Sequence, residues 1–301
     1  MSPDTSRAQA LAQHLIRHHS AMQAGDPLPA SAQSDTSVTG LALHIALAAL
    51  GFIPRDAEVV KQAWQRQSQR LGGFDPELWP TEAMDFGPLA QAHPLPCAPC
   101  PRHLGLYAVL PDAAWVARMA QAGVPTLQLR FKSNDRAAIE REVKAAVAAV
   151  RGSDSLLFIN DHWASAIEHG AYGVHLGQED LQMAPIERIR LSGLRLGLST
   201  HGYAEMLRAA SVGPSYLALG AVFPTTLKRM ATAPQGPGRL RAYARLMQRF
   251  ALVGIGGIDV TRFAEVLDCG VGSIAVVRAI VGQDEPEAAA KQLMAAMQAG
   301  R

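Results

Sequence analysis

The sequence predicts an α/β fold: a (β/α)8 TIM barrel over residues 103–301, preceded by a mainly helical extension. Two observations support it. Beyond Leu104, short runs rich in Leu and β-branched residues alternate with Ala-rich segments, which is typical of βα units around a parallel sheet. Eight such units fit into about two hundred residues, near the lower size limit of a closed barrel. A doubly wound open sheet is the alternative architecture.

The expected strands are short and mostly apolar. They are Leu104–Leu110, Thr126–Arg130, Leu156–Asn160, Gly173–Leu176, Arg195–Ser199, Tyr216–Gly220, Leu252–Ile255 and Gly272–Val276. Helical stretches lie between several of them and after the last one. The clearest are Ala113–Ala122, Asp135–Arg151, Tyr203–Ser211, Gly238–Phe250, Thr261–Asp268 and Glu285–Ala299.

The first hundred residues differ from the rest of the chain in their sequence pattern, because they show no clear strands. Residues 1–92 are predicted to form a helical accessory region of unknown role, with the apolar run Val38–Ile53 as a buried helix. Residues 93–102 contain four prolines, which predicts an extended linker. Cys97 and Cys100 have the spacing of a redox or zinc site. Because no second ligand pair follows, we favour the plain linker.

The composition excludes several classes of function. A net charge of +2 without clustered Lys and Arg argues against nucleic-acid binding. The first twenty residues carry His and Arg where an export signal needs an apolar stretch, and no apolar run is long enough to span a membrane. Three cysteines suit a reducing compartment, so we expect a cytoplasmic protein, with a homo-oligomer as an open possibility.

Polar residues follow the predicted strands, where side chains of a barrel share one mouth. After the second strand, Gln128, Arg130 and Lys132 alternate and therefore point the same way. Two cations and an amide suit a polyphosphate, although a solvated strand end would show the same pattern. The third strand ends in Asn160 and Asp161, where Asp161 either caps the next helix or binds a metal.

Asp180, after the fourth strand, gives Asp161 a partner from the neighbouring strand end. Two carboxylates with substrate phosphate oxygens are a usual environment for Mg²⁺. His175 lies within its strand and is expected to be a hydrogen-bonded core or wall residue and not a metal ligand, because Mg²⁺ prefers oxygen ligands.

The remaining strand ends carry hydroxyls, glycines and cations that suit phosphate groups. These residues are Ser199, Thr225, Thr226, Lys228, Gly256, Gly257 and Arg278, the last of which follows Val277 after the eighth strand. Adjacent glycines also occur in ordinary tight turns. The position of Gly256 and Gly257 after the seventh strand is what favours a phosphate site, because barrels often bind phosphate there.

Taken together, these motifs resemble the thiamine phosphate synthase family in order and spacing, over essentially all of residues 103–301. They read LQLRFK from Leu127, IND from Ile159, GVHLGQED from Gly173, GLSTH from Gly197, GAVFPT from Gly220 and GIGGI from Gly254. The resemblance implies an enzyme that joins hydroxymethylpyrimidine pyrophosphate to a thiazole phosphate, with Mg²⁺, and releases pyrophosphate. The family is thought to pass through a pyrimidine carbocation.

The resemblance also assigns roles. It implies that Gln128, Arg130, Lys132, Asn160 and Lys228 bind the pyrimidine pyrophosphate, and that Asp161 and Asp180 hold the metal. Thr225, Gly256, Gly257 and Val277 would hold the thiazole phosphate. Lys132, Ser199 and Lys228 are the expected catalytic groups, acting on the departing pyrophosphate.

Two positions depart from the family pattern. The loop reads Thr225-Thr-Leu-Lys228 instead of Thr-x-Thr-Lys, which leaves Thr226 as the second hydroxyl. Arg278 stands where the family commonly has Ser, and it either replaces a hydroxyl contact or points into solvent. Two other functions stay open: a thiazole tautomerase-like isomerase, and a catalytically silent ligand-binding regulator.

Overall fold

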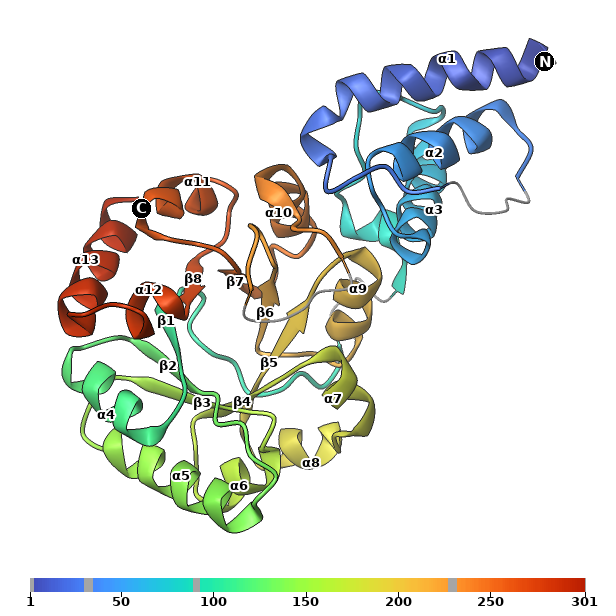
Figure 1. The fold of residues 1–301 in the computed structure, drawn as a ribbon. Coiled ribbons are helices and arrows are strands. Elements are labelled where there is room, and N and C mark those ends of the chain that lie inside the picture. The colour runs from blue at the N-terminus through green and yellow to red at the C-terminus, as the bar shows by residue number, and fades with distance from the viewer. Residues whose placement is uncertain (1–2, 30–34, 89–92, 227–231, 301) are drawn as a thin grey trace.

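The computed structural model describes residues 3–29, 35–88, 93–226 and 232–300 (Figure 1). Its main part is a closed barrel of parallel strands in sequential order, in which β1 also pairs with β8. The strands are β1 Gly105–Leu110, β2 Thr126–Leu129, β3 Leu156–Asn160, β4 Gly173–Leu176, β5 Arg195–Thr200, β6 Tyr216–Leu219, β7 Ala251–Ile255 and β8 Ser273–Val276. The barrel prediction is confirmed, and the open sheet is excluded.

Helices surround the barrel (Figure 1). They are α4 Ala113–Gln121, α5 Arg136–Ala149, α6 Trp163–Glu168, α7 Gln178–Met183, α8 Ile186–Leu191, α9 Tyr203–Ser211, α10 Gly236–Leu246, η4 Val260–Arg262, α11 Phe263–Leu267, α12 Arg278–Val281 and α13 Pro286–Ala299. Side-chain caps begin several of them. The carboxylate of Asp112, for example, accepts a hydrogen bond from the backbone N–H of Trp115 at the start of α4.

The described part of the first hundred residues is helical, as expected. It contains α1 Pro3–His18, η1 Ser20–Met22, α2 Val38–Ala49, α3 Pro54–Leu71 and η2 Ala83–Phe86. We call residues 3–29 and 35–88 the N-terminal helices. They lie beside α9 and α10 of the barrel (Figure 1).

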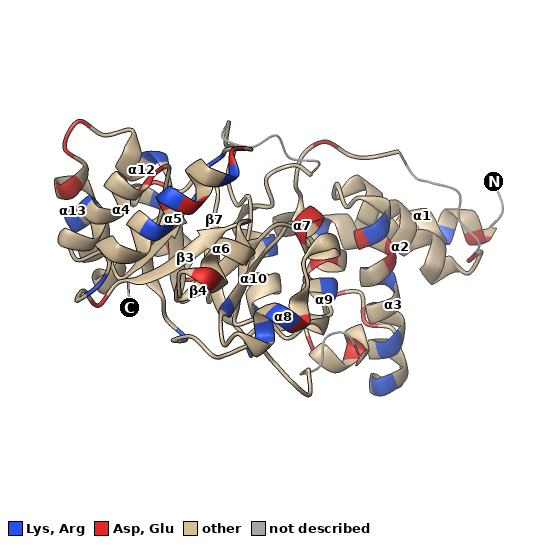
Figure 2. Cartoon of the chain, turned by 90° about the horizontal axis from the view of Figure 1, so that it is seen from below, with Lys and Arg blue, Asp and Glu red and all other residues tan. Residues whose placement is uncertain are grey.

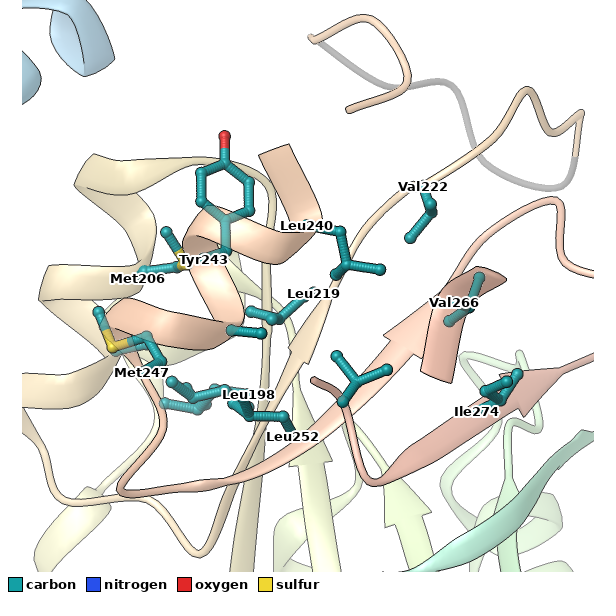
Figure 3. Close-up of a cluster of buried hydrophobic side chains, with 14 of the residues drawn as sticks. Leu198, Met206, Leu219, Val222, Leu240, Tyr243, Met247, Leu252, Val266 and Ile274 are labelled. Atoms are coloured by element: carbon teal, nitrogen blue, oxygen red, sulfur yellow. The ribbon is translucent and has the colours of Figure 1, made fainter. Parts of the chain in front are cut away.

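Two apolar clusters form the core. One fills the barrel interior around Tyr107, Phe158 and Tyr216, which are all almost fully buried. The other lies between the strands and the outer helices, with Leu198, Met206 and Leu240 among its members (Figure 3). This second cluster continues without a break into α1, α2 and α3, so the N-terminal helices and the barrel share one core.

A buried arginine fastens the two parts together. Arg239 of α10 is 2% exposed, and its guanidinium donates to the backbone carbonyls of Met22 and Leu50, each over 2.8 Å. The same group lies over the ring of Phe52 at 3.6 Å. Taking a cation out of water costs on the order of several kcal/mol, and hydrogen bonds to buried carbonyls offset part of that cost.

Residues 93–104 carry no helix or strand, and they run against the barrel. The backbone N–H of Cys97 donates to the carbonyl of Gly213, and the thiol of Cys100 contacts the carbonyl of Ser215. Burial raises the pKa of both thiols, that of Cys100 to about 11. These cysteines are therefore packed side chains in the segment that was expected to be a linker.

Charged residues are spread over the outer helices of the barrel and over the N-terminal helices (Figure 2). Among the residues that the structure describes, no helix is both long and apolar enough to cross a bilayer.

Candidate active site

A cavity of about 960 Å³ opens at the carboxyl ends of the barrel strands. Its wall brings together most of the predicted site residues. They are Gln128, Arg130, Lys132, Asn160, Asp161, Asp180, Ser199, Thr225, Gly256, Gly257, Val277 and Arg278. Thr226 is not part of the wall itself. Lys228 lies outside the described residues, as does Leu227.

Two cations enter the wall directly after β2. Arg130 is half-buried and its backbone N–H donates to the carbonyl of Leu110, whereas Lys132 is exposed to the open cavity. Gln128, inside the strand, is 5% exposed and its side-chain amide donates to the hydroxyl of Tyr107 over 3.0 Å. The segment thus presents positive charge above a buried polar group.

Two carboxylates meet on the neighbouring side of the cavity. Asp161 takes a left-handed backbone conformation, φ 64°, immediately after β3. Burial, the nearby charge of Asp180 and a hydrogen bond between the two carboxyls together raise the pKa of Asp161. Such a shift arises when two acidic groups share one site, and a cation between them would relieve it.

The Asp161–Asp180 pair supplies the hard oxygen atoms that Mg²⁺ favours. Asp180 also accepts a hydrogen bond from the backbone N–H of Gly177 over 3.2 Å, which fixes the start of α7. Within the described residues, no cluster of three or more His, Cys, Asp or Glu side chains forms a metal site made of protein groups alone. A divalent ion here would therefore need further oxygens from the substrate or from water.

A chain of buried hydrogen bonds supports Ser199 from below. The hydroxyl of Ser199 lies 2.8 Å from Nε2 of His175, and Nδ1 of His175 lies 2.7 Å from the hydroxyl of Tyr216. Tyr216 and Tyr107 share a further hydrogen bond of 2.7 Å. The sequence predicted His175 as a hydrogen-bonded core or wall residue but gave no sign of either tyrosine, because an aromatic residue within a strand reads as ordinary core.

The opposite side of the cavity is built around Gly256 and Gly257, which have φ values of 101° and 66°. A Cβ at Gly256 would lie 2.5 Å from that of Ala221, and one at Gly257 would lie 2.5 Å from the carbonyl oxygen of Pro224. Glycine is thus required both by the backbone conformation and by the loop after β6. Arg278 lines the cavity and donates to the hydroxyl of Thr226 over 3.1 Å.

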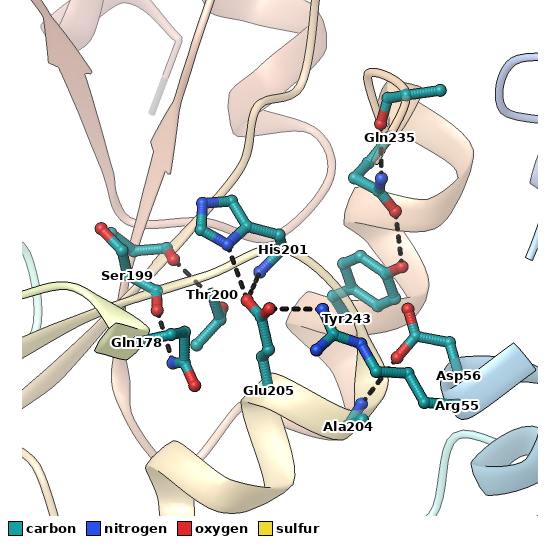
Figure 4. A network of polar contacts seen from close by, with 12 residues as sticks. Arg55, Asp56, Gln178, Ser199, Thr200, His201, Ala204, Glu205, Gln235 and Tyr243 are labelled. Carbon is teal, nitrogen blue, oxygen red and sulfur yellow. Dashed lines mark hydrogen bonds and ion pairs between the residues drawn. The ribbon is translucent and has the colours of Figure 1, made fainter. Parts of the chain in front are cut away.

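His201 also lines the cavity and was not singled out from the sequence. Its Nδ1 lies 2.6 Å from the carboxylate of Glu205, four residues along the chain. Glu205 in turn pairs with Arg55 of α3 (Figure 4). A contact across 150 residues leaves no periodic signal in the sequence, so only the structure reveals it.

Comparisons with known proteins point to one family. The family model described as thiamine monophosphate synthase matches residues 106–280. The thiamine-phosphate synthase of Neisseria meningitidis serogroup A is 53% identical over 192 residues, which are 64% of this chain and 94% of that protein. The Serratia proteamaculans protein of the same name is 50% identical over 194 residues, 64% of this chain and 92% of its own.

A solved structure gives the same result. The thiamine phosphate pyrophosphorylase from Pyrococcus furiosus superposes with a TM-score of 0.58 at 29% identity, covering 66% of this chain and 98% of its own. The family model covers more than half of the chain, and the relatives are matched over nearly their full length. The chain therefore belongs to the thiamine monophosphate synthase family.

Proposed function

We propose that the barrel joins hydroxymethylpyrimidine pyrophosphate to a thiazole phosphate, giving thiamine phosphate and pyrophosphate. One observation carries this proposal: Arg130 and Lys132 share one cavity with the Asp161–Asp180 pair. A diphosphate with a divalent cation needs both kinds of group within reach, and neither kind alone would suffice. The names of the relatives support the same reaction.

The residues present fit Mg²⁺. Asp161 and Asp180 are hard oxygen donors whose mutual repulsion a dication would relieve. When bound, the metal would supply positive charge to the phosphate oxygens. Asp161 and Asp180 would hold it, while the remaining coordination positions are left to substrate and water.

The other residues would bind and align the two substrates. Arg130 and Lys132 stabilise negative charge that grows on the diphosphate as it departs, which lowers the barrier because the interaction strengthens during the reaction. Ser199 reaches the same group through a hydroxyl that His175 orients.

The thiazole phosphate would bind on the other side of the cavity, at Gly256, Gly257, Thr225 and Val277. No covalent nucleophile is needed, since alignment of the two partners is enough. Lys228 is assigned to the pyrimidine pyrophosphate by resemblance alone.

The test is formation of thiamine phosphate and pyrophosphate by the full chain, with both substrates and Mg²⁺. Lys132→Ala and Asp161→Ala should lose most turnover while remaining folded. Matched controls are Lys144→Ala and Asp154→Ala, which remove exposed charges outside the cavity wall and should leave turnover unchanged. If either site variant stayed fully active, the site assignment would be wrong.

The two remaining functions predict different results in the same assay. A tautomerase would interconvert thiazole tautomers supplied alone, with no pyrimidine substrate present. A silent regulator would bind both substrates without releasing pyrophosphate.

Three free thiols support a cytoplasmic location for the protein, which fractionation of cells would test.

A further inference from the structure

The N-terminal helices reach the proposed active site through three side chains. Nη2 of Arg55, in the first turn of α3, donates to Oε1 of Glu205 over 2.6 Å. The other carboxylate oxygen, Oε2, accepts from Nδ1 of His201 over 2.6 Å and from the backbone N–H of His201 over 3.0 Å. His201 lies in the cavity wall, so the chain of contacts runs from α3 to the site (Figure 4).

Glu205 is held firmly because it is buried and fully paired. Its side chain is 9% exposed, compared with 46% for Arg55. Burial acts most strongly on Glu205 and by itself would raise the pKa of this carboxyl. The hydrogen bond and charge of His201, with the charge of Arg55, outweigh burial and lower the pKa of Glu205 below its ordinary value. The group is therefore an ionised, oriented acceptor.

This arrangement fixes the ring of His201. A carboxylate can only accept a hydrogen bond, so Nδ1 must carry a proton and Nε2 is turned away from Glu205 (Figure 4). His201 follows Ser199 by two residues at the end of β5, beside the group predicted to contact pyrophosphate. The orientation of the His201 ring therefore affects the part of the cavity beside Ser199, where the diphosphate is proposed to bind.

The same turn is held at a second point. Oδ1 of Asp56 accepts from the backbone N–H of Ala204 over 2.9 Å. Asp56 approaches so closely that a Cβ at Gly202 would lie 2.0 Å from its Oδ2. Two consecutive residues of α3 thus hold the first turn of α9, on which Glu205 stands.

We propose that Arg55 is a positioning residue for this site: it holds Glu205 and, through Glu205, orients His201 for contact with the diphosphate-bearing substrate. The inference rests on the proposed function. Arg55 lies outside residues 106–280, which the family model matches. The meningococcal relative aligns over 94% of its own length but 64% of this chain, so it has no counterpart for about a third of this protein.

The test compares full-length variants. Arg55→Ala should lower kcat/KM by about three- to tenfold, the range expected for a half-exposed ion pair that acts through one oriented group. Arg55→Lys should restore most of this loss, because an ammonium can still pair with Glu205. The control is Arg245→Ala. Arg245 pairs with Glu82 over 3.0 Å and so also joins the N-terminal helices to the barrel, but it lines no part of the cavity.

The protonation of Nδ1 in the His201 ring distinguishes a positioning role of Arg55 from a role in merely attaching the N-terminal helices to the barrel. Histidine ¹⁵N spectra, assigned with His201→Asn, should show a protonated Nδ1 in the wild type and in Arg55→Lys and Arg245→Ala. In Arg55→Ala and Glu205→Gln this signature should weaken, at temperatures where melting curves show every variant folded. Inorganic pyrophosphate with Mg²⁺, added as a probe, should shift the His201 signals of the wild type.

Two results would overturn the proposal. One is an Arg55→Ala variant with wild-type kcat/KM and unchanged His201 signals. The other is an Arg245→Ala variant that loses kcat/KM equally, because the effect would then belong to docking. If the wild type formed no thiamine phosphate, the proposed function would fail, whereas the His201 signals would still decide whether Arg55 positions the ring.

Discussion

The carboxylate of Asp56 accepts a hydrogen bond from the backbone N–H of Ala204, so a residue of α3 caps the first turn of α9. Asp56 is 2% exposed, and its burial, the strongest influence, raises the pKa of this carboxyl from 3.8 to about 6. A cap made by a distant part of the chain joins the two parts while carrying a buried charge at neutral pH.

Replacing Asp56 should reveal the cost of that charge. Between about pH 4 and pH 6 the folded protein binds a proton at Asp56 that the unfolded chain has released, so stability from this group falls as pH rises through that window. Asp56→Asn keeps the acceptor and removes the charge. Its stability relative to the wild type should rise by about 2 to 3 kcal/mol from pH 4 to pH 7.

The measurement is denaturant unfolding of both proteins at a series of pH values. Asp56→Ala is the companion variant, because it removes the acceptor as well and should cost about 1 kcal/mol relative to Asp56→Asn at every pH. A stability difference between Asp56→Asn and the wild type that did not change with pH would contradict the assignment.

Gly202→Ala should destabilise the protein by about 1 to 3 kcal/mol, because the new Cβ would overlap the carboxylate of Asp56. The backbone at Gly202 is extended, so strain in φ plays no part. Gly73→Ala is the control, since nothing lies within 4 Å of a Cβ at that position. Combining Gly202→Ala with Asp56→Ala should recover part of the loss, as thermal melts would show.

A chain shortened to begin at residue 103 should be less stable than the full chain, because Arg239 loses the carbonyls of Met22 and Leu50. Arg239→Ala should cost about 2 to 4 kcal/mol in the full chain, where buried carbonyls lose their donor, and little in the shortened chain. Unfolding of the four proteins by urea gives the coupling directly. Equal losses in both lengths would show that Arg239 does not fasten the two parts.

Tyr216→Phe should lower both stability and turnover. The variant removes the hydrogen bond between Tyr216 and Nδ1 of His175, at a cost of about 1 to 3 kcal/mol, and with it one contact that orients the ring beside Ser199. Tyr107→Phe is the matched variant, since it keeps the bond between Tyr216 and His175. Its turnover should fall less than that of Tyr216→Phe when both are assayed with Mg²⁺, and the reverse order would contradict this role for Tyr216.

The strands were predictable because their apolar runs are bounded by glycine and polar residues. Each observed strand differs from the prediction by at most one residue at either end, as with Gly105–Leu110 against Leu104–Leu110. The short helix Gln178–Met183 was missed because its polar residues read as a loop. Its helical start depends on Asp180, which accepts from Gly177.

The predicted site residues also had a local signal, since each lies near or after the carboxyl end of a strand. The groups that support them did not. Tyr216 reads as core, and the pairing of Arg55 with Glu205 joins residues 150 positions apart. A single sequence carries no periodicity for such contacts, because they depend on how the N-terminal helices pack on the barrel.

The bond between Arg239 and Leu50 spans 189 positions of the chain, and that between Arg239 and Met22 spans 217. During synthesis the first helices leave the ribosome long before α10 exists to cover them. At about 5 to 20 residues per second, the carbonyls of Met22 and Leu50 are without this donor for roughly ten seconds or more. We therefore expect the N-terminal helices to dock on the barrel only after translation has passed α10.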